Sequence, residues 1–310
     1  MILKKIAVTI YQELCGIPQI FICILNKLLH PHKSILLKGF FIFKGCKLAN
    51  FNWGDDINYY FIKDMTKAHV ALLPDTKIAK ILPISNYLCI GSTIMSFDMK
   101  KTIVWGAGLL NDKMGFKVKS KPQKVLAVRG PLTRKWLLEQ GIECPEIYGD
   151  PALLLPQFYN CKKNIKYKMG IIPHYIDMDS PIVKKIIKED GVKFIKISGY
   201  SNWHDFVKEI NECEFVVSSS LHGVIVSEAY GVPVLWVKFD EDRYVEGWDF
   251  KFHDFYESIH KNDMNYININ NLTTYKDLRN ICDQWEKADI NVEKLLKSCP
   301  FELDFSLSSK

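Results

Sequence analysis

The sequence predicts an α/β protein made of two doubly wound, Rossmann-like domains that face a cleft. Three observations support this prediction. From residue 34 onward, short apolar runs alternate with amphipathic stretches, and many of the runs show no alternation of apolar and polar residues. Such runs are typical of parallel strands that helices cover on both faces. The length of 310 residues also exceeds one ordinary hydrophobic core and suits two domains.

The predicted elements follow one another in a βαβ rhythm. The apolar runs predict strands at 35–43, 69–73, 87–91, 103–105, 124–128, 168–172, 193–197, 215–218 and 234–237. Apolar residues at helical spacing predict helices at 57–65, 131–140, 182–189, 203–211 and 221–230, followed by 275–287 and 292–297. A strand, a helix and a second strand in this order imply parallel sheets.

A polar stretch, QFYNCKKNIK at 157–166, separates the two series of strands. We therefore expect an N-terminal Rossmann-like domain at 34–156, a C-terminal one at 167–262 and a mainly helical tail at 263–310. The apolar fraction of 48% and the charged fraction of 25% are those of a soluble globular protein. Nine scattered cysteines without CxxC spacing favour free thiols in the cytoplasm over a disulfide framework or a zinc site.

The N-terminal segment, residues 1–33, is both basic and apolar. The net charge of +6 comes from residues 1–54, where Glu13 is the one acidic residue. The apolar run LCGIPQIFICIL at 14–25 is shorter than the ~20 residues that span a bilayer. A signal peptide is not expected either, because Glu13 and Pro18 interrupt the apolar region that it needs. Two interpretations stay open: an interfacial segment on the inner face of the membrane, or a buried first helix with solvated Lys ends.

Two acidic residues stand at the start of a predicted helix in the stretch NWGDDINYYF. Asn52 precedes them, and Asp55 and Asp56 follow Gly54. Asn, Gly and Asp all favour turns and helix caps, so the stretch fits a surface turn. It also fits the edge of an active site, where a carboxylate faces a substrate.

Candidate anion-binding residues follow two strands of the first half. Gly106 and Gly108 come after the strand at 103–105, where glycine permits either a tight turn or a close ligand. Arg129 comes after the strand at 124–128, and its planar guanidinium suits a carboxylate or a phosphate. The competing interpretation of Arg129 is a surface ion pair.

A third candidate lies in the second half, in the stretch SSSLHG. Ser219 and Ser220 lead into a predicted helix that opens with Leu221 and His222. A helix N-terminus offers unpaired N–H groups and the positive end of the helix dipole, which together favour an anion. His222 in the first turn could donate to that anion or act as an acid, or it could be satisfied by a backbone carbonyl.

Five segments in order resemble the polysaccharide pyruvyl transferase family over roughly residues 45–260. They are NWGDDINYYFIKDM, VWGAG, VRGPLTRKWLLEQGI, YGDPALLLP and SSSLHGVIVSEAYGVPV. The resemblance implies a glycosyltransferase-B-like (GT-B) pair of domains and phosphoenolpyruvate as the donor, without a further cofactor. The implied product is a capsule or exopolysaccharide sugar, expected to be undecaprenyl-linked, whose two hydroxyls pyruvate bridges as a cyclic ketal.

The resemblance also implies roles for residues. Asp55 and His222 are the expected catalytic residues, and Arg129 matches an Arg of the family. The expected donor-binding residues are Arg129, Ser219, Ser220, Leu221, Gly106 and Gly108. The family's Ser-x-Arg-Leu-His motif has Ser220 at its Arg position, so one expected cation is missing. Candidates for further donor or acceptor contacts are Lys251, Arg243, Asp56 and Asn52.

Two other functions stay open at this point. A nucleotide-sugar glycosyltransferase of the same architecture would bind phosphate at the same helix N-terminus, although no Glu–x7–Glu ribose-binding pattern is evident. A non-catalytic, membrane-associated assembly protein would account for the basic N-terminus alone. We expect neither a metal site nor a nucleic-acid partner.

Overall fold

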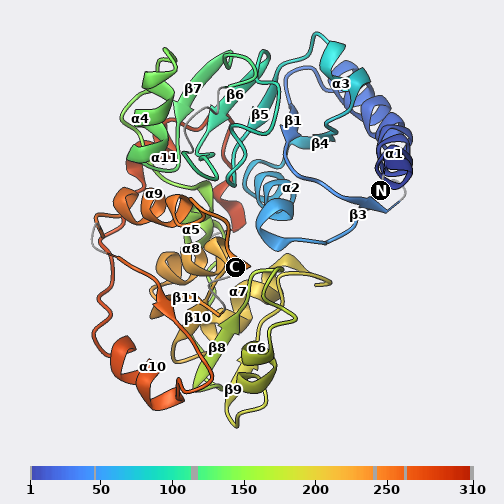
Figure 1. Ribbon diagram of the computed structural model, residues 1–310. Helices are drawn as coiled ribbons and strands as arrows, with labels where there is room; N and C mark the ends of the chain where they lie inside the picture. The colour runs from blue at the N-terminus through green and yellow to red at the C-terminus, as the bar shows by residue number, and fades with distance from the viewer. Residues whose placement is uncertain (1, 45–46, 113–117, 240–242, 262–263, 308–310) are drawn as a thin grey trace.

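The computed structural model consists of two five-stranded parallel sheets flanked by helices (Figure 1). It describes residues 2–44, 47–112, 118–239, 243–261 and 264–307. In the first helix, α1 (Ile2–Leu29), side chains are described at residue 11 and from residue 13 on.

The first sheet has the strand order β4-β1-β5-β6-β7. Its strands are β1 (Ser34–Lys38), β4 (His69–Leu73), β5 (Asn86–Leu88), β6 (Thr102–Trp105) and β7 (Lys124–Ala127). The helices of this half are α1, α2 (Trp53–Thr66), α3 (Lys77–Ile81) and α4 (Pro131–Glu139). A small antiparallel pair, β2 (Phe43–Lys44) and β3 (Lys47–Leu48), follows β1.

The second sheet has the strand order β12-β11-β10-β8-β9. Its strands are β8 (Met169–Ile172), β9 (Val192–Phe194), β10 (Val216–Ser218), β11 (Val234–Lys238) and β12 (Ile267–Asn268). The helices are α6 (Pro181–Ile186), α7 (Trp203–Asn211), α8 (Leu221–Tyr230), α9 (Phe250–Ser258), α10 (Tyr275–Cys282) and α11 (Glu293–Lys297). Short helices η1 (Pro151–Leu154) and α5 (Leu155–Phe158) precede this sheet, and η3 (Phe305–Leu307) ends the described chain.

Both sheets share one topology. Numbered along the chain, each has its second strand at one edge, followed by its first, third, fourth and fifth strands. The strand order therefore reverses between β1 and β5 in the first sheet and between β8 and β10 in the second. Ligands of doubly wound proteins bind at such reversals, outside the carboxyl ends of the strands. The fold thus directs attention to the segments that follow β1, β5, β8 and β10.

The nine predicted strands and the predicted helices are all present, most with shorter bounds. The strand predicted at 35–43 ends at Lys38, and residues 39–42 leave the sheet. The helix predicted at 275–287 ends at Cys282. The sequence analysis missed the short helix α3, the helix α9 and the edge strand β12. The cysteines that the structure describes carry free thiols.

The core of the first half continues into the second. Trp53 at the start of α2 stacks on Phe206 of α7 at 4.4 Å, and its indole N–H donates to the carbonyl of Trp203. The C-terminal tail returns to the first half: the Trp105 indole N–H donates to the Leu295 carbonyl at 3.2 Å. Figure 1 shows α11 beside the first sheet. Because buried residues of both halves form one cluster, the domain bounds given above stay a prediction.

The first helix packs on the sheet with one face and leaves the other uncovered. Ile20 and Cys23 are buried against Leu36 of β1 and Leu73 of β4. Most of the exposed side chains described in α1 are nonetheless apolar, and Lys27 is the charged exception: they are Tyr11, Leu14, Ile17, Phe21, Ile22, Leu25, Leu28 and Leu29. The interpretation as a buried first helix with solvated Lys ends is therefore wrong for this face. In the described part of the chain, no helix is both long enough and apolar enough to cross a membrane.

Candidate functional site

A pocket of about 520 Å³ lies between the two sheets, at the strand-order reversals of both. This volume is within the range of small-molecule sites. The first half contributes Phe40, Phe41, Ile42, Phe51, Asn52, Asp55, Gly91, Ser92, Thr93, Ser96 and Leu110. The second half contributes His174, Tyr175, Ser220, Leu221, His222, Trp248 and Lys251. We call this cavity the inter-sheet pocket.

The N-terminus of α2 forms one wall of the inter-sheet pocket. Asn52 is the N-cap: its side-chain oxygen accepts from the Gly54 N–H, and its Nδ2 donates to Asp55 Oδ2 at 2.6 Å. An added Cβ at Gly91, which follows β5, would lie 3.8 Å from Asp55 Oδ1. Gly91 has φ +108, which disfavours other residues. The cap and this turn together aim the Asp55 carboxylate at the pocket.

Burial raises the pKa of Asp55 to about 7. The neighbouring negative charge of Asp56 adds to this shift, whereas the hydrogen bond from Asn52 and the positive charge of Lys251 oppose it. A carboxyl group that titrates near neutral pH can both accept and return a proton. Asp55 is therefore suited to act as a base toward a hydroxyl.

Asp56 has a different surrounding. Its side chain is buried, and Oδ2 accepts from the Asn52 backbone N–H at 3.2 Å and from the Tyr200 hydroxyl at 2.9 Å. Burial raises its pKa to about 6. Asp56 is not among the lining residues and ties the start of α2 to the second half.

The N-terminus of α8 forms the opposite wall. Ser220 is its N-cap but makes no side-chain capping hydrogen bond, so its side chain satisfies none of the first-turn N–H groups. Ser220, Leu221 and His222 all line the inter-sheet pocket. Uncapped first-turn N–H groups and the helix dipole favour an anion at this wall.

The ring of His222 fits against the backbone of α2. A Cβ added at Gly54 would lie 2.1 Å from His222 Nδ1, so only glycine leaves room for the ring. Burial lowers the pKa of His222 to about 3, and the positive charges of Arg129 and Lys251 lower it further. His222 is therefore neutral near pH 7, and an anion bound beside it would favour the protonated form.

A buried carboxylate faces the other edge of this ring. Asp150 Oδ2 lies 3.9 Å from His222 Nε2, which is too far for a hydrogen bond, and neither atom has a hydrogen-bond partner among the described residues. Asp150 Oδ1 accepts from the Ala152 N–H, which holds the carboxyl group in place. Burial raises the pKa of Asp150 to about 6. The nearby carboxylate favours a proton on Nε2 electrostatically.

Lys251 and His174 complete the electropositive side of the pocket. Lys251 Nζ lies 3.5 Å from the centroid of the Trp248 ring. Burial lowers the pKa of Lys251 to about 7, and the charge of Arg129 lowers it further. The pKa of His174 is lowered to about 3 by burial, by Lys251 and by His222. Several nitrogen bases share this desolvated space, where an anion would be their natural counter-charge.

Ser219 supports the pocket from behind. Its hydroxyl donates to Asp177 Oδ2 at 2.5 Å and accepts from the His174 backbone N–H at 2.9 Å. The Tyr244 hydroxyl donates to the same carboxylate at 2.6 Å. Arg243 donates to the Ile176 carbonyl. Neither Ser219 nor Arg243 is among the lining residues.

The structure does not bring Arg129 to the pocket surface. Its guanidinium is fully buried and forms an ion pair with Asp254 of α9, with Nη2 and Oδ2 2.9 Å apart. Nη2 also donates to the Leu109 carbonyl and Nη1 to the Ser92 hydroxyl, both at 2.6 Å. The ion pair is thus buried and joins the two halves, and the expectation of a surface ion pair is wrong. Of the side-chain hydrogen-bond partners described for Arg129, Ser92 is the one that also lines the pocket.

Neither Gly106 nor Gly108 lines the pocket: Gly108 lies beside Arg129, and Gly106 lies beside Pro151. A Cβ at Gly108 would lie 2.4 Å from the guanidinium carbon of Arg129. Gly106 has φ +88, and a Cβ there would lie 2.3 Å from Pro151. Both glycines therefore permit close packing behind the wall.

Besides most of the apolar lining, the sequence analysis missed His174, Trp248 and Asp150, which lie in or beside the pocket. His174 follows the strand β8 in the same way that Ser219 follows β10, so the strand-end argument could have found it. Trp248 and Asp150 have no such signal, because a loop and a short helix place them. Among the described residues, no group of three or more His, Cys, Asp or Glu could hold a metal ion.

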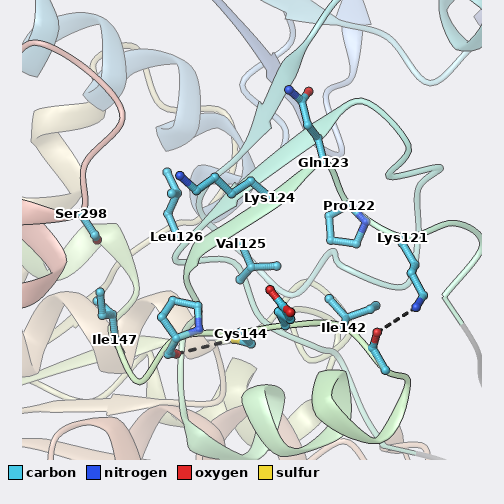
Figure 2. Close-up of a pocket in the computed structure, with 13 residues that line it drawn as sticks. Lys121, Pro122, Gln123, Lys124, Val125, Leu126, Ile142, Cys144, Ile147 and Ser298 are labelled. Carbon is cyan, nitrogen blue, oxygen red and sulfur yellow. Dashed lines mark hydrogen bonds between the residues drawn. The ribbon is translucent and has the colours of Figure 1, made fainter.

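A larger hollow lies elsewhere, beside the edge strand β7 (Figure 2). Its volume is about 810 Å³, and residues 121–126 and 141–147 form most of its lining. Figure 2 shows Lys121 donating to the Gly141 carbonyl at 2.8 Å at one side of it. None of the predicted site residues lies there. We call it the β7 hollow.

Comparison with known proteins gives two similar sequences. An uncharacterized protein of Acanthamoeba polyphaga mimivirus is 30% identical over 213 residues, which are 64% of this chain and 72% of that protein. The succinoglycan biosynthesis protein ExoV of Rhizobium meliloti (strain 1021) is 25% identical over 215 residues, or 67% of this chain. The match covers 61% of ExoV, which is less than two thirds of its length.

Among solved structures, an uncharacterized protein of Klebsiella pneumoniae is similar to 79% of this chain over 97% of its own. The TM-score is 0.41 at 14% sequence identity. A family model described as polysaccharide pyruvyl transferase matches residues 94–241, which include Arg129, Asp150, His174 and His222. The family model and ExoV agree on polysaccharide formation, and the family is one of transferases. The chain belongs to the polysaccharide pyruvyl transferase family.

Proposed function

We propose that the chain transfers the pyruvyl group of phosphoenolpyruvate to a sugar of a capsule or exopolysaccharide precursor. The product is a cyclic pyruvate ketal, and phosphate is released. The observation that carries this proposal is the inter-sheet pocket, where Asp55, His222 and Lys251 line one space beside the uncapped start of α8. Two doubly wound sheets that meet at such a pocket also favour a GT-B-like arrangement.

The electrostatics of the pocket suit the donor. Phosphoenolpyruvate carries a carboxylate and a phosphate, and the second half offers Lys251, His174 and the first turn of α8 as partners. Lys251 takes the place of the cation that Ser220 lacks. Because desolvation strengthens charge interactions, the negative charges of a bound donor would raise the pKa of Lys251 and of His222 and so favour their protonated forms.

The chemistry then follows from the two walls. His222, protonated beside Asp150, delivers a proton to the methylene carbon, which makes the adjacent carbon electrophilic. Asp55 accepts a proton from the first sugar hydroxyl, whose oxygen adds to that carbon. The bond between carbon and the phosphate oxygen breaks, and the second hydroxyl closes the ring. Of the two hydroxyl protons released, one replaces the proton that the methylene carbon received to become a methyl group, and the other leaves with phosphate.

The first helix supports a location at the membrane. The uncovered face of α1 is apolar, and residues 1–54 hold the whole positive excess of the chain. Lysines near an anionic surface contribute about 1 kcal/mol each. We infer that α1 lies on the cytoplasmic face of the membrane, where an undecaprenyl-linked acceptor would be found.

Sedimentation with anionic liposomes tests this location. Wild type should sediment with them at low salt, and the double variant Phe21→Asp, Leu28→Asp should not. Wild type that does not bind such liposomes would contradict the membrane location of α1.

Phosphate release from phosphoenolpyruvate tests the proposal directly. It should depend on an acceptor from a panel of galactose-, glucose- and mannose-type glycans, and the product should have the mass of acceptor plus pyruvic acid less one water. Thermal stabilisation separates the alternatives. Stabilisation by a nucleoside diphosphate but not by phosphoenolpyruvate would favour a glycosyltransferase, and stabilisation by neither would favour a non-catalytic protein.

A further inference from the structure

A second hollow adjoins the inter-sheet pocket and leads toward α1. Its volume is about 470 Å³. It is lined by Tyr11, Cys15, Gly39, Phe40, Phe41, Ile42, Phe43, Pro74, Asp75, Thr76 and Phe97. We call it the α1 groove. Most of these side chains are apolar, and Asp75 and Thr76 are its polar members.

The α1 groove and the inter-sheet pocket share a wall. Phe40, Phe41 and Ile42, the segment that follows β1, line both cavities. Phe40 and Ile42 are 49% and 46% exposed, so this wall is apolar and open to a ligand on either side. A molecule that leaves the inter-sheet pocket over this wall enters the α1 groove without crossing a charged side chain of the shared segment.

The other end of the groove meets the uncovered face of α1. Tyr11 and Cys15 lie one helical turn apart and line the groove, while Leu14, between them, is 60% exposed. Figure 1 shows α1 along the outer side of the first half, with its N-terminal end near β3. The groove therefore connects the candidate active site to the apolar surface of the molecule.

The surroundings of the groove are positively charged. Lys44 and Lys47, on the β2–β3 pair beside the lining residue Phe43, are exposed, and the acidic lining residue Asp75 is paired with Lys80 at 3.2 Å. Glu13, the one acidic residue among residues 1–54, accepts from the Lys77 backbone N–H. An apolar groove among such lysines suits an amphiphile with a hydrocarbon tail and an anionic linkage.

We propose that the α1 groove binds the hydrocarbon tail of a lipid-linked sugar acceptor whose sugar occupies the inter-sheet pocket. This rests on the proposed function for the identity of the sugar, but the tail site can be measured separately. The tail runs from the shared wall past Tyr11 and Cys15 to the membrane under α1. The groove thereby selects acceptors by their lipid.

Alkyl glycosides in a lipid-free assay test the proposal. Methyl and octyl galactosides, glucosides and mannosides are titrated by calorimetry below the concentration at which they form micelles. Each methylene that enters an apolar site strengthens binding on the order of fourfold, so octyl glycosides should bind wild type at least ~10-fold more tightly than methyl glycosides of the same sugar.

Two variants locate the effect. Tyr11→Asp puts a charge into the groove and Cys15→Trp fills it, while Leu14→Asp changes an exposed apolar residue of the same helix outside the groove. The octyl preference should fall below ~3-fold in the first two and persist in the third. Equal binding of methyl and octyl glycosides by wild type, or an undiminished preference in both groove variants, would overturn the proposal.

Two further outcomes are distinct. A preference for octyl glycosides without phosphate release from any acceptor supports the tail site and counts against the proposed function. Phosphate release without a preference for octyl glycosides supports the proposed function and counts against the tail site. Light scattering checks for a second copy of the chain: a dimer that Tyr11→Asp dissociates would mean that the groove is an interface between copies, which overturns the tail site.

Discussion

The inter-sheet pocket and the β7 hollow differ in place and chemistry more than in size. The β7 hollow is larger, at about 810 Å³ against 520 Å³. It lies beside an edge strand, and its charged lining residues Lys121, Lys124 and Glu143 are exposed. The smaller pocket lies where both strand orders reverse, and burial shifts the pKa of Asp55, His174, His222 and Lys251. Desolvated, opposed ionisable groups mark a site better than volume does.

The largest expected difference between the two hollows concerns turnover. His222→Gln should lower kcat by roughly 10²–10⁴-fold if the ring delivers a proton, whereas Lys124→Gln in the β7 hollow should leave it unchanged. Phosphate release measures both. A drop below tenfold would reduce His222 to a spectator, and a raised donor KM with unchanged kcat would make it a binding residue.

The next effect concerns donor affinity. Lys251→Met keeps an apolar contact with Trp248 and removes the ammonium group, so the fold should persist. Loss of a charge-assisted contact costs about 1.5–3 kcal/mol, which weakens phosphoenolpyruvate binding by roughly 10–150-fold. Calorimetric titration measures it, with Lys124→Met as the matched control. Wild-type affinity in a folded Lys251→Met protein would remove Lys251 from the donor site.

A third prediction separates stability from activity at Asp150. Its pKa is raised to about 6 in the folded protein, so the folded state binds more protons than the unfolded chain and loses stability as the pH rises from about 4 to 6. Asp150→Asn removes this loss and should raise the free energy of unfolding by about 1–3 kcal/mol above pH 6. Turnover should fall, because His222 loses the carboxylate that favours its proton on Nε2.

Denaturant unfolding at pH 4 and pH 8 measures the stability effect, with Glu143→Gln in the β7 hollow as an exposed control. A gain of equal size at both pH values would show that titration of Asp150 is not its cause. Unchanged turnover in Asp150→Asn would show that the carboxylate does not act on His222.

The smallest effect is proton uptake when the donor binds. Lys251, with a pKa of about 7, is mostly neutral at pH 8, and His222, with a pKa of about 3, is fully neutral. A bound anion raises both values, as well as that of Asp55, so protons should be taken up. Calorimetric titrations at pH 8 in buffers of different ionisation enthalpy give the number of protons taken up per bound donor. We expect this number to be about one or more. Proton release would contradict this account of the pocket.

Much of the architecture could be predicted from the sequence. Apolar runs without alternation identified the parallel strands, and reading their carboxyl ends led to Asp55 and His222, which line one pocket. The same reasoning could not predict whether a side chain after a strand lines the pocket or is buried behind it. Arg129 also follows a strand, but that strand is β7, far from the reversal between β1 and β5, so its side chain is buried against Asp254. The segments directly after β1, β5, β8 and β10, the strands at the two reversals, all contribute to the lining, whereas Arg129 directly after β7 does not.

Long-range partners were beyond sequence reasoning for a similar reason. Asp150 and His222 are far apart in the sequence. No local sequence pattern predicts that Asp150 Oδ2 lies 3.9 Å from His222 Nε2. The uncovered face of α1 was equally hidden, because an apolar run reads alike whether one face or the whole helix is buried.

Hydrogen–deuterium exchange with saturating phosphoenolpyruvate tests the central claim, that the donor binds at the paired reversals, without any substitution. Backbone amides of the first turn of α8, residues 221–223, should exchange more slowly with the donor present, as should residues 52–55 at the start of α2. Residues 121–126 and 141–147 around the β7 hollow should not change. Protection around the β7 hollow, or none at either helix N-terminus, would contradict this account.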